Sequence, residues 1–551
     1  MRKNRDAAQD AQTLAEIQTL ASGQNVPRAV DLAKAALDDG LVHPLLLNLR
    51  SSGLMSQGKP LEALADLRQA LAIAPGDLFV RNALGMLLVT LERYSEALPL
   101  LRETAELMPE SPLAQYSYGF ALERTGDIDL ARRQFEATIA LDPTFLRALP
   151  HLADFAQRRS DWATATDYAN RALALDSNHY VARTILAIVS IAEGNLDQAE
   201  RLLLPLIGRR ADAPLDASLA RRVLGDLRHA QERHAQAFQA YTLSNRQKYD
   251  IYAARYEKPG ATGTDYCHWL SDYFEVADPS LWSAGRDLTT EPDDPRDGAI
   301  GHVFLVGFPR SGTTLLENVL ASHPDVCTLE EKDTFGELTH QFLVDEQGRD
   351  RLAHLTQDGI AEARKAYWAR VRGFGADVTG KVFVDKYPLS SLKLPMVAKL
   401  FPKARVLFAV RDPRDVVLSC YRRNFAMNSS MFEFLSIDRA ARFYDAAMAT
   451  CDVYRRKLDL PWRQVRNETL VDDFEGEARA IVEFMGLGWN EQMKDFAEHA
   501  KSRTIRTPSS TQVVKGINRE GVGLWRHYEK EMAPAMPYLG RWIKQFGYEN
   551  A

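Results

Sequence analysis

A period of 34 residues in the first half of the chain constrains the fold most strongly. Alanines recur at this interval, at Ala29, Ala63, Ala97, Ala131, Ala165 and Ala199. Prolines follow the same period at Pro75, Pro109 and Pro143, with Ser177 in place of the fourth proline. Small residues also follow it, at Gly85, Gly119, Ala153 and Ala187. Such a period predicts stacked helix pairs, with small residues where helices approach closely and prolines at the turns.

This pattern resembles the tetratricopeptide repeat over roughly residues 10–245. After Leu206 the register shifts by four residues, and Gly225, Ala237 and Tyr241 then restore the pattern. One helix pair cannot bury its apolar face alone, so the pairs are expected to stack into a superhelix with a concave surface. The resemblance implies that this surface binds an extended peptide or protein. A purely structural or dimerising array is the alternative interpretation.

A second feature is the stretch HVFLVGFPRSGTT at residues 302–314, followed by LLENVLASHP. The apolar run before the glycine is typical of a strand, and the leucines and valines after Thr314 repeat at helical spacing. The loop therefore lies between a strand and a helix N-terminus, where backbone N–H groups are unpaired and partly positive. This geometry predicts that the loop from Gly307 to Thr314 holds a phosphate.

The spacing Gly307 to Gly312 to Thr314 fits the phosphate loop of nucleoside triphosphatases with one departure, because Thr313 occupies the lysine position. That lysine reaches the β- and γ-phosphates, so its absence argues against ATP or GTP hydrolysis. Arg310 lies inside the loop instead. From the glycine spacing alone, an ordinary strand-to-helix turn capped by a hydroxyl is an equal alternative.

Length and composition limit the classes of protein to which the chain can belong. The chain has 551 residues, which suggests two or three domains, and it is 46% hydrophobic with a net charge of −6. We therefore expect a soluble globular protein without bulk attraction to nucleic acid. The four cysteines are far apart and form no metal-ligand pair, which favours a reducing compartment. No apolar run is long enough for a signal peptide or membrane span, so we expect a cytoplasmic protein.

Strand-like and helix-like stretches alternate in the second half: HVFLVG then TLLENVLASH, KVFVDK then LSSLKLPMVAKLF, ARVLFAV then DVVLSCYRRNF. Alternation predicts an α/β domain with a parallel sheet, helices on both faces and ligand at the carboxyl ends of the strands. Residues 250–300, which precede this domain, are rich in Pro, Gly and Asp and also contain several aromatic residues. We expect a repeat domain at 1–249 with about seven repeats, a connecting segment at 250–300 packed between domains, and an α/β domain at 301–551.

Over roughly residues 301–548 the second half resembles the sulfotransferase family, specifically its tyrosylprotein branch. The resemblance is carried by PRSGTTLLENVLASHPDV followed by EE, by FPKARVLFAVRDPRDVVLS, and by SSTQVVKGIN ahead of a tryptophan. It implies transfer of a sulfuryl group from 3′-phosphoadenosine 5′-phosphosulfate to an acceptor hydroxyl, with no catalytic metal. A donor without a γ-phosphate also accounts for a phosphate loop that lacks the lysine.

The resemblance assigns nucleotide-binding roles to residues of two loops. The 5′-phosphosulfate is expected on Pro309, Arg310, Ser311, Gly312, Thr313 and Thr314. The 3′-phosphate is expected on Arg411 and Ser419, with Arg423 one helical turn further as a helper. A planar guanidinium binds phosphate bidentately, so Arg411 suits this role chemically.

The catalytic roles are implied in the same way. Glu331 matches the family's general base, with Glu330 as the adjacent alternative, and Arg310 stabilises the moving sulfuryl group. Lys386 matches the lysine near the bridging oxygen. Ser509, or Ser510 beside it, is expected to contact the leaving group. Where the family has a lysine before a tryptophan the chain has Leu524, so Lys515 or Arg526 is expected to substitute; Asn467 stands in place of a tyrosine.

Protein tyrosine is the acceptor that the resemblance favours, with the repeats binding the acceptor or a partner. Two other interpretations remain. The acceptor could be a saccharide, lipid or small phenol, with the repeats used for assembly, or the second half could be an inactive nucleotide-binding scaffold. Phosphoryl transfer is a weaker third reading, since the lysine and a clear set of Mg²⁺ ligands are missing.

Overall fold

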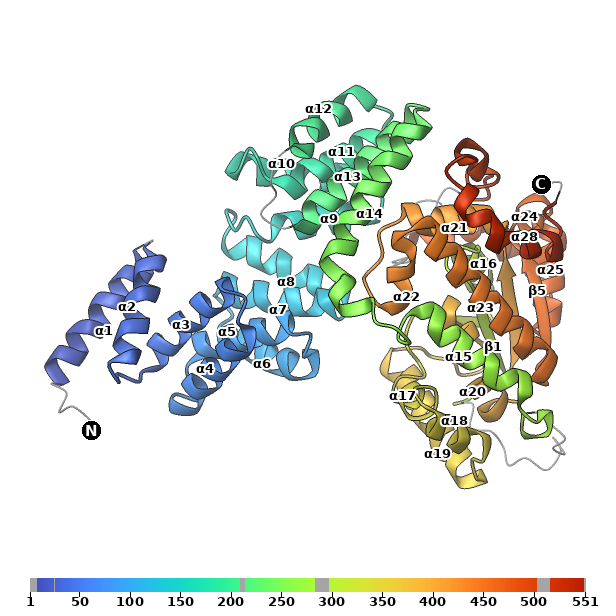
Figure 1. The fold of residues 1–551 in the computed structure, drawn as a ribbon, viewed down its shortest axis with the longest axis horizontal. Helices are drawn as coiled ribbons and strands as arrows, with labels where there is room; N and C mark the ends of the chain where they lie inside the picture. Colours follow the sequence, from blue (N-terminus) through green and yellow to red (C-terminus); the bar gives the residue numbers. More distant parts are fainter. Residues whose placement is uncertain (1–6, 24, 209–213, 283–296, 503–515, 550–551) are drawn as a thin grey trace. The chain divides into compact units, whose positions relative to one another are not determined.

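A computed structural model of the protein describes residues 7–23, 25–208, 214–282, 297–502 and 516–549 (Figure 1). The chain divides into two compact units. The first holds the residues up to Gln157 and Asp161–Leu186. The second holds Arg158–Ser160 and the chain from Ala187 onward. No helix in the described ranges is both long enough and apolar enough to cross a bilayer.

The first unit consists of helices that pack in pairs. Their bounds are α1 Ala7–Ser22, α2 Val26–Asp38, α3 Pro44–Ser56, α4 Pro60–Ile73, α5 Leu78–Thr90, α6 Tyr94–Leu107, α7 Pro112–Arg124, α8 Ile128–Leu141, α9 Leu149–Arg158 and α10 Trp162–Leu175. The periodic alanines from Ala29 to Ala165 are fully buried, as the helix-pair prediction requires. At Gly85 an added Cβ would lie 2.6 Å from Leu101 Cδ2, so α5 and α6 approach too closely for a side chain there.

The helical array continues into the second unit. Its elements are α11 Tyr180–Ala192, which crosses the boundary, α12 Leu196–Ile207, α13 Pro214–Ala230, α14 His234–Tyr256 and α15 Gly263–Val276. Helices α13 and α14 pack along their length, and Tyr241 of α14 donates a hydrogen bond of 2.9 Å to Asp226 of α13. The inner face of α15 joins the core that covers one side of the sheet, since Cys267, Leu270 and Phe274 are all fully buried there.

The sheet of the second unit has five parallel strands in the order β2-β3-β1-β4-β5. Their bounds are β1 Gly301–Gly307, β2 Val326–Glu330, β3 Val382–Lys386, β4 Arg405–Val410 and β5 Trp462–Arg466. The predicted parallel α/β arrangement is therefore confirmed. Strand β1 is central, with Leu305 opposite Lys386 of β3 and Gly307 opposite Ala409 of β4.

Side chains of β1 alternate between two hydrophobic cores, so both faces of the sheet are covered. Val303 and Leu305 join the core with α16 (Thr313–Ala321), α25 (Phe474–Phe484) and α26 (Phe496–Ser502). Phe304 and Val306 join the core with α21 (Pro413–Arg422), α23 (Ile437–Lys457) and α28 (Met536–Gln545). The helices of this part are α16 Thr313–Ala321, α17 Glu337–Phe342, α18 Glu346–Ala353, α19 Gln357–Gly373, α20 Leu394–Leu400, α21 Pro413–Arg422, α22 Ser429–Phe432, α23 Ile437–Lys457, α24 Asn467–Asp472, α25 Phe474–Phe484, α26 Phe496–Ser502 and α28 Met536–Gln545. Short 3₁₀ helices are η1 Pro279–Leu281, η2 Pro388–Lys393, η3 Glu433–Leu435, η4 Glu491–Asp495, η5 Leu524–Tyr528 and η6 Ala533–Ala535.

Candidate active site

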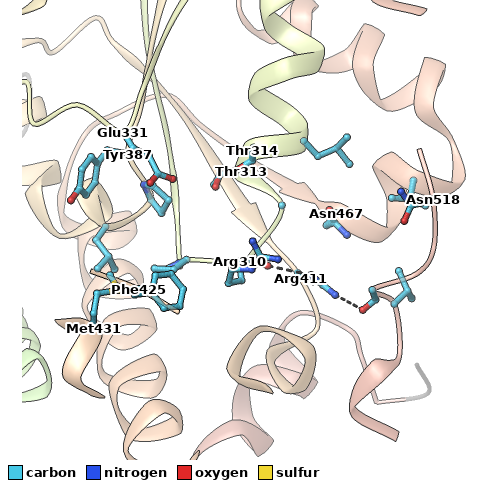
Figure 2. Close-up of a pocket in the computed structure, with 18 of the residues that line it drawn as sticks. Arg310, Thr313, Thr314, Glu331, Tyr387, Arg411, Phe425, Met431, Asn467 and Asn518 are labelled. Atoms are coloured by element: carbon cyan, nitrogen blue, oxygen red, sulfur yellow. Dashed lines mark hydrogen bonds between the residues drawn. The ribbon is translucent and has the colours of Figure 1, made fainter. Parts of the chain in front are cut away.

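A pocket lies at the carboxyl ends of β1, β3 and β4, where ligands bind in sheets of this kind (Figure 2). It is lined by Pro309, Arg310, Gly312, Thr313, Thr314, Leu315, Glu331, Tyr387, Pro388, Leu389, Arg411, Phe425, Met431, Asn467, Val471, Gly516, Asn518, Gly521 and Val522. Its wall includes the loop after β1, Tyr387 after β3 and Arg411 after β4.

The loop after β1 has the backbone shape of an anion cradle. Gly312 has φ 98° and Arg310 has φ 72°, both in the left-handed region. An added Cβ at Gly312 would overlap Oδ1 of Asn467, so only glycine fits this position. Helix α16 begins at Thr313, and its N-cap residue, Gly312, has no side chain that could cap the first turn. Its N–H groups and partial positive charge are therefore presented at the pocket, beside Thr313 and Thr314.

Arg310 is buried in this loop and held from the helix after β4. Its Nε donates a hydrogen bond of 3.0 Å to Ser419 Oγ on α21. Burial, and secondarily the charges of Arg423 and Arg411, lower the pKa of Arg310 to about 9. Neighbouring cations that are packed together out of water gain most from a bound polyanion, because such an anion offsets their mutual repulsion.

Arg411 lies in the pocket wall beside the loop and is fixed by two carbonyl groups. It donates to the carbonyl oxygen of Gly521 and, over 3.4 Å, to that of Arg310. Its Nε is buried yet has no hydrogen-bond partner among the described residues. A buried donor without a partner costs free energy, so this nitrogen is suited to a ligand oxygen that arrives in the pocket.

Glu331 lines the pocket and is held from behind by Lys386. Lys386 Nζ lies 3.0 Å from Glu331 Oε1, 3.2 Å from Glu317 Oε2 and 3.6 Å from Glu330 Oε1. Burial by itself would lower the pKa of Lys386, but the three carboxylates raise it above its ordinary value. A backbone bond of 2.8 Å from Glu331 N to Lys386 O, together with φ 45° at Glu331, aims this carboxylate at the pocket while Glu330 stays on the strand.

The pocket has two chemically different ends. In Figure 2, Glu331, Tyr387, Phe425 and Met431 lie on one side, Asn467 and Asn518 lie on the other, and Arg310 lies between them. One end is thus aromatic and apolar around a carboxylate. The other end carries the side-chain amides of Asn467 and Asn518 and is close to Arg411. A group transferred from a polar ligand to an apolar acceptor would pass Arg310.

The predicted site residues fall into three sets. Those in the pocket wall are Pro309, Arg310, Gly312, Thr313, Thr314, Glu331 and Arg411. Those behind it are Ser311, whose hydroxyl donates to Phe308 O at 2.7 Å, Ser419, Lys386, and Arg423, whose charge interacts with Asp226 of α13. Ser509, its alternative Ser510, and Lys515 lie outside the described residues.

Several wall residues carry no sequence signal that identifies them. Tyr387 directly follows the lysine at the end of β3, so its place could have been inferred from the strand. Asn467 stands where the family has tyrosine, and it packs against Gly312. Phe425 and Met431 come from a segment without strand or helix periodicity, and only the fold brings them to the pocket.

Comparisons with known proteins find similar families for both parts of the chain. Residues 302–491 match the family model described as "Sulfotransferase family", and residues 82–144 and 184–247 match a tetratricopeptide-repeat model. The chain is 26% identical over 252 residues to an uncharacterised protein of Aquifex aeolicus, a match that covers 44% of this chain and only 33% of that protein. It is 26% identical to Protein-tyrosine sulfotransferase 1 of Danio rerio, covering 43% of this chain and 71% of the relative.

Two further similarities are more limited. Protein-tyrosine sulfotransferase of Drosophila melanogaster is 28% identical over 40% of this chain and 46% of its own length. The pilus biogenesis factor PilW, a solved structure, is 19% identical with a TM-score of 0.32, covering 37% of this chain and 94% of PilW. That structural likeness is too low to support an argument. The family matches are specific, and residues 302–491 are therefore a sulfotransferase-family domain, on a chain whose preceding part contains tetratricopeptide repeats.

Proposed function

We propose that the protein transfers a sulfuryl group from 3′-phosphoadenosine 5′-phosphosulfate to an acceptor hydroxyl, with protein tyrosine as the acceptor. The observation that carries the proposal is the buried Nε of Arg411, which lacks a partner among the described residues and belongs to the same pocket as the N-terminus of α16. A nucleotide with phosphate groups at both ends would satisfy both sites at once. The loop residue Thr313 in place of lysine fits a donor without a γ-phosphate.

The geometry supports an in-line transfer. Glu331 accepts the proton of the acceptor hydroxyl as its oxygen attacks sulfur, and the bond from sulfur to the 5′-phosphate oxygen breaks. Arg310, between the two ends of the pocket, stabilises the charge on the moving group and on the leaving phosphate. Lys386 lies behind Glu331 and orients its carboxylate. Thr313, Thr314 and the backbone of α16 hold the 5′ side, and Arg411 holds the 3′-phosphate.

Tyrosine as acceptor rests on two supports. The relatives from Danio rerio and Drosophila melanogaster are named for this substrate. The acceptor end of the pocket offers Tyr387, Phe425 and Met431, which suit a phenol ring better than a sugar. We further propose that the tetratricopeptide repeats, assigned to residues 1–249, bind the acceptor protein or a partner.

A calorimetric titration with 3′,5′-adenosine bisphosphate tests the nucleotide assignment. We expect binding without added metal, and a Kd at least about tenfold weaker in Arg411→Ala, because a charge-assisted contact is worth about 1.5–3 kcal/mol. Arg479→Ala is the control, since Arg479 pairs with Glu475 on the surface. Binding of ATP with magnesium in preference to the bisphosphate would overturn the proposal.

A further inference from the structure

The acceptor end of the pocket depends on one irregular segment, which we call the acceptor segment and define as residues 423–432. It connects α21 to the end of α22 and contributes Phe425 and Met431 to the pocket wall. Residues 423–428 belong to no helix or strand, and α22 has only four residues. Such a segment makes few backbone bonds of its own, so its position has to be set by whatever it packs against.

The last helix of the repeat array, α14, contacts the start of the acceptor segment at Asn424 and the preceding end of α21 at Tyr421. Asn245 Nδ2 of α14 donates 3.0 Å to the carbonyl oxygen of Tyr421, and Lys248 Nζ donates to Asn424 Oδ1. The hydroxyls of Thr242 and Tyr421 are 2.7 Å apart. Asn245 is 4% and Lys248 is 5% exposed, so these bonds are shielded from water.

The same helix also contacts the middle and the end of the segment. The hydroxyl of Tyr256 donates 3.2 Å to the carbonyl oxygen of Met427, and the ring of Tyr249 stacks on Phe432 with centroids 5.4 Å apart. Beyond Phe432, the buried carboxylate of Glu433 accepts two bonds of 3.2 Å from Thr264 at the start of α15. Phe425 and Met431 therefore lie between anchors on either side.

The Lys248 contact carries a cost in stability, and it also fixes the position of its acceptor. Its ammonium is buried against an amide oxygen, and burial lowers the pKa of Lys248 to about 7. A methionine of similar shape would avoid the cost of desolvating a charge. A buried donor nonetheless specifies one position for its acceptor, which a methionine would not.

We propose that α14 of the repeat array positions the acceptor segment, so that Asn245, Lys248 and Tyr249 determine acceptor binding through Phe425 and Met431. The identity of this end as the acceptor end rests on the proposed function. On this view the repeats contribute positioning residues to the active site, in addition to any binding of partners. None of the three lines the pocket, so we expect donor binding to change little when they are substituted.

Matched substitutions on α14 in the full-length chain test the proposal. Asn245→Ala and Lys248→Met remove donors to the segment around residues 421–424. Gln247→Ala removes an amide of the same helix that instead donates 2.7 Å to the carbonyl oxygen of Pro214 on α13. Tyr249→Ala removes the ring stacked on Phe432, and Tyr249→Phe keeps it. The measurements are initial rates with labelled donor and 4-nitrophenol, calorimetry with 3′,5′-adenosine bisphosphate, and hydrogen exchange of residues 423–432.

We expect Asn245→Ala, Lys248→Met and Tyr249→Ala to raise the KM for 4-nitrophenol by about fivefold to tenfold, the effect of losing one shielded contact. The Kd of the bisphosphate should stay within about twofold. Amides of residues 423–432 should exchange faster in these variants, and Gln247→Ala and Tyr249→Phe should match the wild type.

Two outcomes overturn the inference: unchanged KM and exchange in all variants, or an equal loss of donor binding in Asn245→Ala and Gln247→Ala, which would indicate general destabilisation. Failure of the proposed function is distinguishable. In that case the wild type would not bind the bisphosphate or turn over 4-nitrophenol, while the exchange measurement would still decide whether α14 positions the segment.

Discussion

Asp385 and Lys386 are adjacent at the end of β3 yet meet opposite environments, because successive side chains of a strand point to opposite faces. Lys386 contacts three carboxylates beside the pocket. Asp385 is buried on the other side, where it accepts bonds of 2.6 Å from Thr334 Oγ1 and 2.7 Å from Tyr367 Oη. The strand geometry alone separates the surroundings of these two neighbours.

Asp385 should make stability depend on pH. Burial raises the pKa of Asp385 to about 6, and its hydrogen bonds only partly offset this. Because this exceeds the unfolded value of about 3.9, the native state binds the extra proton. The stabilisation is complete below pH about 4 and is lost as pH rises through 6. Relative to Asp385→Asn, the free energy of unfolding of the wild type should fall by about 2–3 kcal/mol between pH 4 and pH 7.

Urea titrations of both proteins, followed by tryptophan fluorescence, check this expectation. The chain has 8 tryptophans, of which only Trp162 belongs to the first unit, so the signal reports mainly on the unit that contains Asp385. Parallel stability curves for wild type and Asp385→Asn across this pH range would show that the carboxyl group is already ionised in the native state.

Glu331→Gln should lower kcat by about 10²–10⁴-fold, the usual contribution of a general base. Donor binding should be nearly unchanged, since the amide keeps the shape of the carboxylate and Lys386 retains its contacts with Glu317 and Glu330. Rates with labelled donor and bisphosphate calorimetry measure the two effects. Glu330→Gln is the matched variant: a larger loss of kcat there than in Glu331→Gln would move the base to the neighbouring residue.

At the scale of elements, the join between β1 and α16 was the most predictable part of the site. Strand, glycine turn and helix follow each other within the 13 residues of 302–314, so local propensity and backbone chemistry are sufficient. The acceptor segment is the opposite case. Its residues form no periodic pattern, and Asn424, next to Phe425, is hydrogen-bonded to Lys248 of α14, 176 positions earlier in the chain. No local rule could predict such a placement.

Gly312→Ala tests the turn that precedes α16. Gly312 has φ 98°, and a Cβ there would overlap Asn467, so the substitution should strain the backbone by about 1–2 kcal/mol and displace either Asn467 or the helix N-terminus. We expect the Kd of 3′,5′-adenosine bisphosphate to rise at least about tenfold by calorimetry. Gly540→Ala in α28 is the control, because a Cβ there meets nothing within 4 Å. Equal affinity in the two variants would show that the loop does not hold the nucleotide.

At the scale of the whole molecule, the period in the sequence and the compact units divide the chain differently. The repeats were predicted from the spacing of small residues and prolines. Such spacing predicts each helix pair, but it does not indicate what that pair packs against. Helices α12 to α14 carry the repeat pattern and nevertheless share a compact unit with the sheet. Phe238 of α14 stacks on Tyr421 with centroids 5.1 Å apart, and His229 of α13 is hydrogen-bonded to Tyr528 at 2.8 Å.

This organisation predicts where the chain tolerates truncation. A chain of residues 250–551, cut at the end of the repeat pattern, would expose apolar side chains that α13 and α14 cover, among them Tyr421, Phe432 and Tyr528, which are now at most 4% exposed. A chain of residues 177–551 keeps α11 to α14 and leaves these side chains covered. We expect the 250–551 chain to aggregate on expression, because exposed apolar patches promote association. We expect the 177–551 chain to be soluble and to bind 3′,5′-adenosine bisphosphate within about twofold of the full-length affinity. Soluble yield, size-exclusion chromatography and calorimetry make the comparison. A soluble 250–551 chain with full nucleotide affinity would mean that the last repeats are dispensable for the fold of the sulfotransferase domain.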